Sequence, residues 1–375
     1  MTIELEPSLE RWVEARILDR EQADRIRQWE TQQAPRHRAR WPVVIAVTFG
    51  GIMLAAGALL FVSAHWDQMS PLQRMTLLVS AVGLFHVGGA LSLERFHALG
   101  VTLHAVGTVA LGGAIAMAGQ IFNMQEHWPT ATLLWALGAV AGWLLLRDWP
   151  HLALAAILLP FWVAAEYSED VLMSQGAALA MDSGCLLLAI CYFTVRVPGA
   201  EGRHAHVRTA LTWLGGFALL PATLVVALNH AYFDTHTTGA GALAIGWSLA
   251  MLLPLALAWV FRRNAAWMNV VAAIWVVGLG SVGAAGESPL VYAWCGIGAA
   301  GMVGWGLYES RAERVNLGMA GFAITIIWFF FSSVMDRLDR SLSLIVLGIL
   351  FLGGGWAGEK LRRKLVAGLA TGGVQ

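Results

Sequence analysis

Hydrophobic runs of about 20 residues follow one another from Pro42 almost to the C-terminus, separated by short polar breaks. A helix needs about 20 apolar residues to cross the hydrocarbon core of a bilayer. The pattern therefore predicts an all-α, polytopic bundle of about twelve transmembrane helices. The fifth of these spans is shorter than the others. The predicted spans are residues 42–62, 72–93, 97–119, 130–147, 151–165, 172–194, 208–229, 240–261, 265–284, 289–308, 315–335 and 341–358.

The first 41 residues are polar and contain eight arginines and eight acidic residues. A short amphipathic helix is predicted from Ser8, and Asp19 and Gln22 form a capping-box pattern that opens a second helix through about Trp29. The apolar positions recur at helical spacing, at Leu9, Trp12, Val13, Ile17, Ala23, Ile26 and Trp29. We interpret this as a cytoplasmic helical hairpin with one apolar face. That face either rests on the membrane or its own helices, or docks a protein partner at residues 8–30.

These patterns divide the chain into four parts. Residues 1–41 form the head, 42–165 the first membrane half, 166–364 the second membrane half, and 365–375 a cytoplasmic tail.

Composition supports a membrane location and excludes other classes. Apolar residues make up 58% of the chain and charged residues 13%, whereas a soluble domain carries about 25% charged residues. The net charge is zero, so no nucleic-acid partner is indicated and the lipid bilayer is the expected partner. The three cysteines lie within apolar runs, which favours a packing role over a disulfide or metal framework.

Charge placement predicts the orientation. With the head on the cytoplasmic side, 21 of the 24 lysines and arginines fall on inside segments, as the positive-inside rule requires. No cleavable signal peptide is recognised, because the first apolar run is long enough to remain in the membrane. We therefore predict a multi-pass protein of the bacterial inner membrane with both termini in the cytoplasm.

Three ionisable residues are predicted to lie deep in the bilayer, where such groups are costly and often functional. Asp182 lies near the centre of the sixth span, His86 in the second and His104 in the third. All three fall at similar depth, so a carboxylate and imidazoles could relay protons. The alternative is a static polar cluster that holds helices together, or residues that never meet.

A second polar set is predicted at the outer face. Two His-Trp dipeptides occupy successive outside breaks, and Arg74 lies among acidic and amide side chains. The set either orders the loops beside an interfacial tryptophan belt or forms a polar mouth that binds a solute. Its members are His65, Trp66, Asp67, Arg74, Gln120, Asn123, Glu126 and His127.

The first half resembles the domain-of-unknown-function 2157 family of bacterial predicted membrane proteins. The likeness lies in Leu9–Glu14 with Ile17–Ala23, in His65–Pro71 with Arg74, and in Gly119–Asn123 followed by Trp135. It covers about residues 1–165. The resemblance implies a multi-span membrane protein and brings no established activity or catalytic residues.

No catalytic, cofactor or metal motif is present: Walker loops, Rossmann glycines, a nucleophile elbow and HExxH are all absent from the sequence. Three functions remain open. The first is a small-solute transporter, with or without proton coupling. The second is a non-enzymatic scaffold or sensor that docks a partner through the head. The third is a membrane-embedded enzyme acting on lipids. A polar cavity beside Asp182 would favour transport, and a closed apolar bundle would favour the scaffold.

Overall fold

The computed structural model describes residues 17–33, 64–122, 127–171, 175–196, 205–228, 239–284 and 288–335, with isolated positions in 9–15, at 53 and in 345–360. Every secondary-structure element in these ranges is helical. The chain forms two compact units, Met1–Ser70 and Pro71–Gln375.

The first unit contains helix α2, Arg20–Gln33. It begins where the capping pattern predicts, because the backbone N–H of Asp19 donates to Oε1 of Gln22 over 2.9 Å. Trp12, Ile17 and Trp29 are 40%, 68% and 58% exposed, whereas Leu9 and Ala23 are buried, so the predicted apolar face of the head is exposed only in part. Much of the first predicted helix of the hairpin, and nearly all of the span 42–62, lie outside the described residues.

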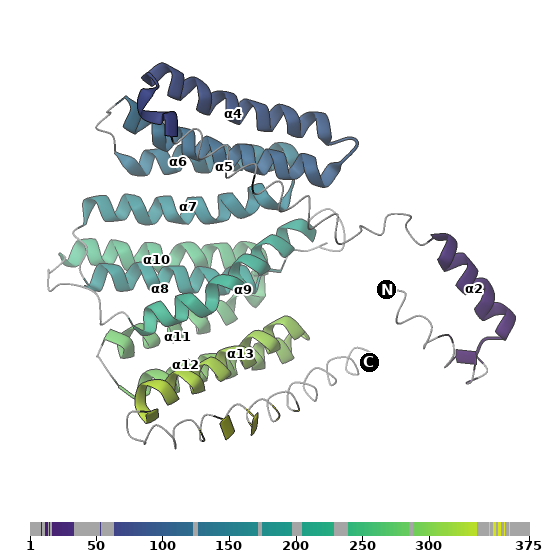
Figure 1. The fold of residues 1–375 in the computed structure, drawn as a ribbon. Helices are drawn as coiled ribbons and strands as arrows, with labels where there is room; N and C mark the ends of the chain where they lie inside the picture. The colour runs from purple at the N-terminus through teal and green to yellow at the C-terminus, as the bar shows by residue number, and fades with distance from the viewer. Residues whose placement is uncertain are drawn as a thin grey trace. The chain divides into compact units, whose positions relative to one another are not determined.

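The second unit is a bundle of helices that lie side by side (Figure 1). Each predicted span from 72–93 to 315–335 has its own helix, and the span 341–358 falls mostly outside the described residues. The helices are α4 (Pro71–Ser92), α5 (His97–Ile121), α6 (Trp128–Leu146), α7 (Trp149–Asp170), α8 (Gln175–Phe193), α9 (Ala205–Ala227), α10 (Ala240–Arg262), α11 (Trp267–Ala284), α12 (Leu290–Tyr308) and α13 (Ala312–Phe329).

Nine stretches of the described chain are long and apolar enough to cross a membrane. One of them, Ala240–Ala284, is 45 residues long, more than twice what a bilayer core requires. It consists of α10 and α11, separated by the 3₁₀ turn Arg263–Ala266. Arg263 has φ 51°, outside the helical region, and this ends α10.

The fifth span is longer than its apolar run predicts. Helix α7 covers 22 residues, Trp149–Asp170, instead of residues 151–165. Pro150 stands in the first turn, where its missing N–H costs nothing. At the other end, Glu166 and Glu169 continue the helix beyond the apolar segment, because glutamate has a good helix propensity.

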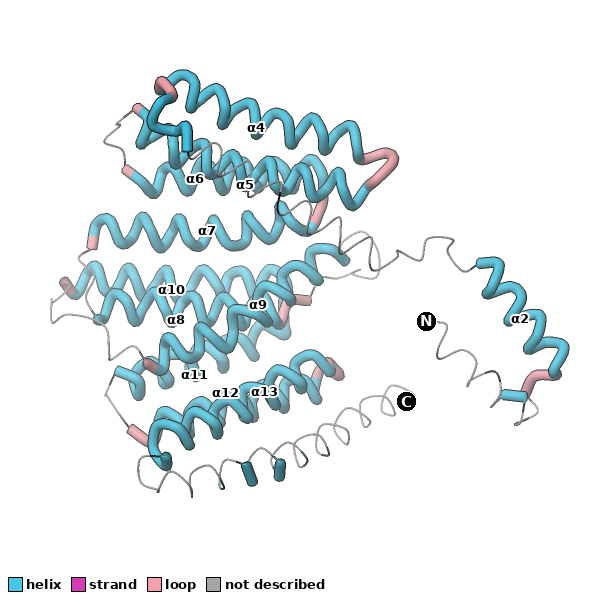
Figure 2. Tube along the Cα trace, in the orientation of Figure 1, coloured by secondary structure: helices cyan, strands magenta, loops and turns pink. Residues whose placement is uncertain are grey.

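Consecutive helices pair as α4–α5, α6–α7, α8–α9 and α12–α13, and α8 also packs on α10 and α11 (Figure 2). Helix α8 is the most buried, with 61% of its apolar window buried against 6% for α4. Leu186 and Leu187 of α8 pack with Val276 and Leu279 of α11 in the main hydrophobic core. The core of the described bundle therefore lies in the second membrane half.

Candidate functional site

Two of the predicted intramembrane residues meet. Nδ1 of His86 on α4 lies 3.1 Å from Nδ1 of His104 on α5, and their ring centroids are 5.3 Å apart. A hydrogen bond between two ring nitrogens requires one to carry a proton and the other to accept it. Nε2 of His104 is buried without a hydrogen-bond partner among the described residues. The contact therefore allows one imidazole to donate a hydrogen bond to the other.

A second polar group lies between α5 and the start of α7. Nδ1 of His151 is 2.8 Å from a carboxylate oxygen of Asp148, and its Nε2 is 2.9 Å from the hydroxyl of Thr108. The His151 side chain is fully buried, and that of Asp148 is 7% exposed. Asp148 also caps α7 by accepting from the backbone N–H of His151. The carboxylate fixes both the helix start and the imidazole.

Glycines on neighbouring helices make room for these rings. A Cβ at Gly142 of α6 would lie 2.3 Å from the His151 ring, and one at Gly89 of α4 would lie 2.8 Å from the His104 ring. The His86 ring lies against Gly107 of α5 in the same way. Small residues allow this close approach in membrane bundles, so each imidazole is held by the packing of two helices.

The Thr108 hydroxyl serves both protonation states of His151. With neutral His151, Nδ1–H donates to Asp148 and Nε2 can accept from the hydroxyl. With protonated His151, Nε2–H donates to the hydroxyl, which then donates to the carbonyl of His104, 3.1 Å away. The change requires only rotation of the O–H bond.

The residues of the outer-face set are distributed over both units. Trp66–Gln68 forms a short 3₁₀ helix in the first unit, and Arg74 lies in the first turn of α4 in the second. Asn123 and Glu126 lie outside the described residues. His127 is joined to Glu166 of α7, with Nε2 2.9 Å from Oε1. Gln120 is exposed near the end of α5.

The family comparison covers the region that contains the histidines. Residues 10–152 match the model of a family described as Predicted membrane protein (DUF2157). The resemblance inferred from the sequence motifs is thereby confirmed. No curated protein and no solved structure matches the chain. The DUF2157 region includes His86, His104, Thr108, Asp148 and His151.

Asp182 lies outside the DUF2157 region, on α8. It is half-buried, on a helix that packs mainly on α9, α10 and α11, whereas α5 packs on α4 and α6. The acidic residue that acts electrostatically on His104 is Asp148. Met181 and Cys185, close to Asp182 in sequence, line an apolar cavity of about 340 Å³. This cavity therefore lacks the polar lining that transport of a polar solute would favour.

A second buried polar cluster lies beyond the DUF2157 region, at the ends of α8, α10 and α12. Both Arg262 and Arg314 donate to the Glu309 carboxylate and to the carbonyl of Thr194. The indole N–H of Trp305 also donates to Glu309, over 2.9 Å. The three charged side chains are at most 3% exposed. This cluster joins α12 and α13 to α8 and α10.

Charge is unevenly distributed in this cluster. Nε of Arg196, whose side chain is 49% exposed, lies 3.3 Å from Glu309, so three guanidinium groups surround one carboxylate. Burial raises the pKa of Glu309, but the hydrogen bonds from Arg262, Trp305 and Arg314 outweigh it and lower the pKa to about 2. The Nε atoms of Arg262 and Arg314 are buried without a hydrogen-bond partner among the described residues. The cluster retains an excess of positive charge.

Sequence reasoning missed both Asp148 and the Glu309 cluster. The signal for Asp148 is the Asp-x-x-His spacing at Asp148–His151. In this N-cap pattern the aspartate carboxylate is turned towards the imidazole one helical turn later. The signal for the second is Trp305 one turn before Glu309, at the end of an apolar span. Both groups were assigned to polar breaks, where charges are expected to be solvated.

Proposed function

We propose that the protein is a carrier of a small solute coupled to protons, and that His151 with Asp148 and Thr108 forms its proton-binding site. The observation that carries this proposal is the Thr108 hydroxyl, which can accept from or donate to His151 according to its protonation state. A purely structural histidine needs only one such arrangement. His86 on α4 and His104 on α5 supply a second site for a proton.

Membrane residence supports a transport role, since intramembrane ionisable groups mark proton relays in pumps and transporters. His86, His104 and His151 belong to α4, α5 and α7, respectively. A movement of these helices would therefore alter the contacts of the three imidazoles and their affinity for protons. Two cavities of the described bundle, of about 470 and 340 Å³, are lined mainly by apolar side chains. We therefore propose a solute with a substantial apolar part.

Proton movement is expected to depend on the Thr108 hydroxyl. Purified protein is reconstituted into vesicles that contain the pH dye pyranine, and leucine, benzoate or tetraphenylphosphonium is added outside. At least one solute should change the lumenal pH. Thr108→Val should slow the change about tenfold, because a protonated His151 would lose an acceptor worth about 1–3 kcal/mol. Thr108→Ser keeps the hydroxyl and should retain the activity.

The Val and Ser variants differ from wild type by a similar small volume, so equal thermal melting of all three proteins controls for folding. Wild-type vesicles in which none of the three solutes moves protons would contradict the proposal. So would equal rates for Thr108→Val and Thr108→Ser.

A scaffold or sensor role is the second candidate, and the exposed Trp12, Ile17 and Trp29 of the head favour it. Such a face could dock a protein partner at residues 8–30. The vesicle experiment separates the two functions, since a scaffold moves no protons in any variant.

We further propose that the chain lies in the bacterial inner membrane with both termini in the cytoplasm. The contact of Arg196, Arg262 and Glu309 supports this, because it brings together segments that were all assigned to the inside by charge. Reporter fusions after Lys364 should report a cytoplasmic location, and fusions within residues 230–239 a periplasmic one. A periplasmic C-terminus would remove an odd number of spans from the count of twelve.

A further inference from the structure

Two polar contacts tie the α12–α13 hairpin to the rest of the bundle. One is the Glu309 cluster. The other is a reciprocal pair, in which the indole N–H of Trp275 donates to the carbonyl of Trp294 over 2.9 Å and that of Trp294 to the carbonyl of Trp275 over 2.8 Å. Each indole lies against a glycine of the opposite helix, Gly298 or Gly278. The hairpin is thus fixed at two points along α12.

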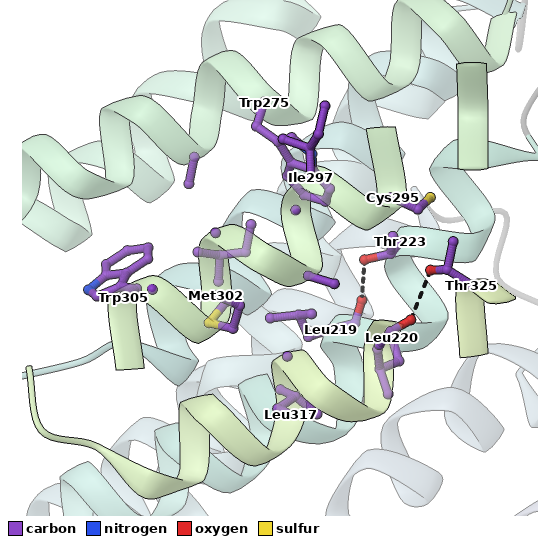
Figure 3. A pocket seen from close by; sticks show the side chains of 18 of the residues that line it. Leu219, Leu220, Thr223, Trp275, Cys295, Ile297, Met302, Trp305, Leu317 and Thr325 are labelled. Atoms are coloured by element: carbon purple, nitrogen blue, oxygen red, sulfur yellow. Dashed lines mark hydrogen bonds between the residues drawn. The ribbon is translucent and has the colours of Figure 1, made fainter. Parts of the chain in front are cut away.

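A cavity of about 470 Å³ is lined by residues of α8, α9, α11, α12 and α13, including Trp275 and Trp305 from these two contacts (Figure 3). Its volume is within the range of small-ligand sites, about 300–1,000 Å³. Gly301 and Gly304 of α12 line it, and a Cβ at either would meet nothing within 4 Å. The glycines of α12 therefore leave open space along one wall.

Several polar groups in the cavity wall already have hydrogen-bond partners. The hydroxyl of Thr223 donates to the carbonyl of Leu219, and that of Thr325 donates to the carbonyl of Gly321. The indole N–H of Trp275 is used in the reciprocal pair. A polar solute would find few free partners here, because unpaired polar groups in an apolar site are costly. The lining suits a hydrocarbon chain.

One end of the cavity has a different character. Trp305 lines it and also lies against two guanidinium groups, with Cζ of Arg262 and of Arg314 at 5.0 and 5.6 Å from its ring. The adjacent lining residue Tyr308 is 75% exposed. Glu309, which follows Tyr308 in the sequence, contacts the half-exposed Arg196. A hydrocarbon chain bound in the cavity would therefore end beside the Glu309 cluster, which has an excess of positive charge.

We propose that this cavity binds an anionic amphiphile. Its hydrocarbon chain lies along Gly301 and Gly304, and its acidic head meets Arg196 beside the Glu309 cluster. An acyl chain enters from the bilayer, where the concentration of lipid is highest. A free fatty acid and an anionic phospholipid share this chemistry. The site does not depend on the proton-binding role of His151.

The test uses the full-length protein in nanodiscs of phosphatidylcholine, which carries no net charge. The probes are palmitic acid with a photoreactive diazirine at mid-chain and the corresponding alcohol, which is neutral. After illumination, peptide mass spectrometry locates the adducts. We expect palmitic acid to label residues 298–308 of α12, and the alcohol to label them about fivefold less, since one exposed ion pair contributes up to about 1 kcal/mol.

Two variants distinguish binding of the hydrocarbon chain of the amphiphile from binding of its acidic headgroup. Gly301→Leu fills the cavity and should abolish labelling of α12 by both probes, whereas Gly113→Leu is the matched control, because Gly113 of α5 is also exposed with open space around it. Arg196→Gln should reduce labelling by the acid about fivefold and leave that by the alcohol unchanged. All variants must melt at the wild-type temperature. If Gly301→Leu does not, Gly304→Leu replaces it.

Competition identifies the source of the amphiphile. Phosphatidylglycerol added to the nanodiscs should suppress labelling if bilayer lipid occupies the site, and leave it intact if the site prefers a free fatty acid. Labelling that is spread equally over α12 and the control helices, or that survives both glycine variants in α12, would overturn the proposal. Equal labelling by acid and alcohol would overturn the part that concerns the anionic head.

Discussion

Replacement of Glu309 by glutamine is expected to lower the free energy of unfolding by about 3–5 kcal/mol. Glu309 is the carboxylate that neutralises Arg262 and Arg314, and all three side chains are at most 3% exposed. Removing one partner of a buried ion pair leaves the other charge without compensation. Unfolding by dodecyl sulfate in mixed micelles, followed by circular dichroism, measures the difference.

Glu313→Gln is the matched control. Glu313 lies only four residues further on, its side chain is 46% exposed, and it approaches Arg311 no closer than 4.0 Å. An exposed pair of this kind contributes about 0.5 kcal/mol or less. Similar losses in the two variants would show that Glu309 has no special role in holding α12 and α13.

The loss of stability in Glu309→Gln should depend on pH in a definite direction. The pKa of Glu309 is lowered from 4.5 to about 2, so its contribution is complete above pH 4.5 and is lost as the pH falls through about 2. Such a lowering corresponds to about 3 kcal/mol. The gap in stability between wild type and Glu309→Gln should stay constant from pH 7 to 4.5 and narrow below. A gap that changes above pH 5 would contradict this assignment.

Gly298→Ala is expected to destabilise the protein by about 1–3 kcal/mol, although alanine favours helices more than glycine does. A Cβ at this position would lie 2.2 Å from the Trp275 ring. The ring cannot move away freely, because its N–H donates to the carbonyl of Trp294. The added methyl group must therefore separate α11 from α12. Thermal melting followed by near-ultraviolet circular dichroism reports both the stability and the tryptophan environment.

Gly301→Ala provides the comparison within the same helix. Its Cβ would meet nothing within 4 Å, so we expect no loss, and a gain of up to about 1 kcal/mol from helix propensity. Gly278→Ala should behave like Gly298→Ala, since Gly278 holds the Trp294 ring. If all three alanine variants melt alike, the reciprocal tryptophan contact does not fix the hairpin.

The depth of a residue in the membrane could be predicted from the sequence, but its neighbours across the bundle could not. His86 and His104 were expected at the same level of two consecutive spans, and they meet because α4 and α5 form a hairpin. Asp182 was expected at a similar depth, yet its helix packs on a different set of neighbours. Position along a helix follows from counting residues, whereas lateral position depends on how all the helices pack.

The sequence by itself determined that this chain is helical and lies in a membrane. Each apolar run must satisfy its own backbone hydrogen bonds in lipid, which leaves a helix as the solution for a run of about 20 residues. Only the tertiary structure decided that His151, which is bonded to Asp148, reaches Thr108, and that Glu309 contacts arginines from α10 and α13. Thr108 and His151 are 43 positions apart in the sequence, and Arg262 and Glu309 are 47 apart. These contacts arise because glycines allow particular helices to approach closely, and a one-dimensional pattern of apolar and polar residues does not specify which helices those are.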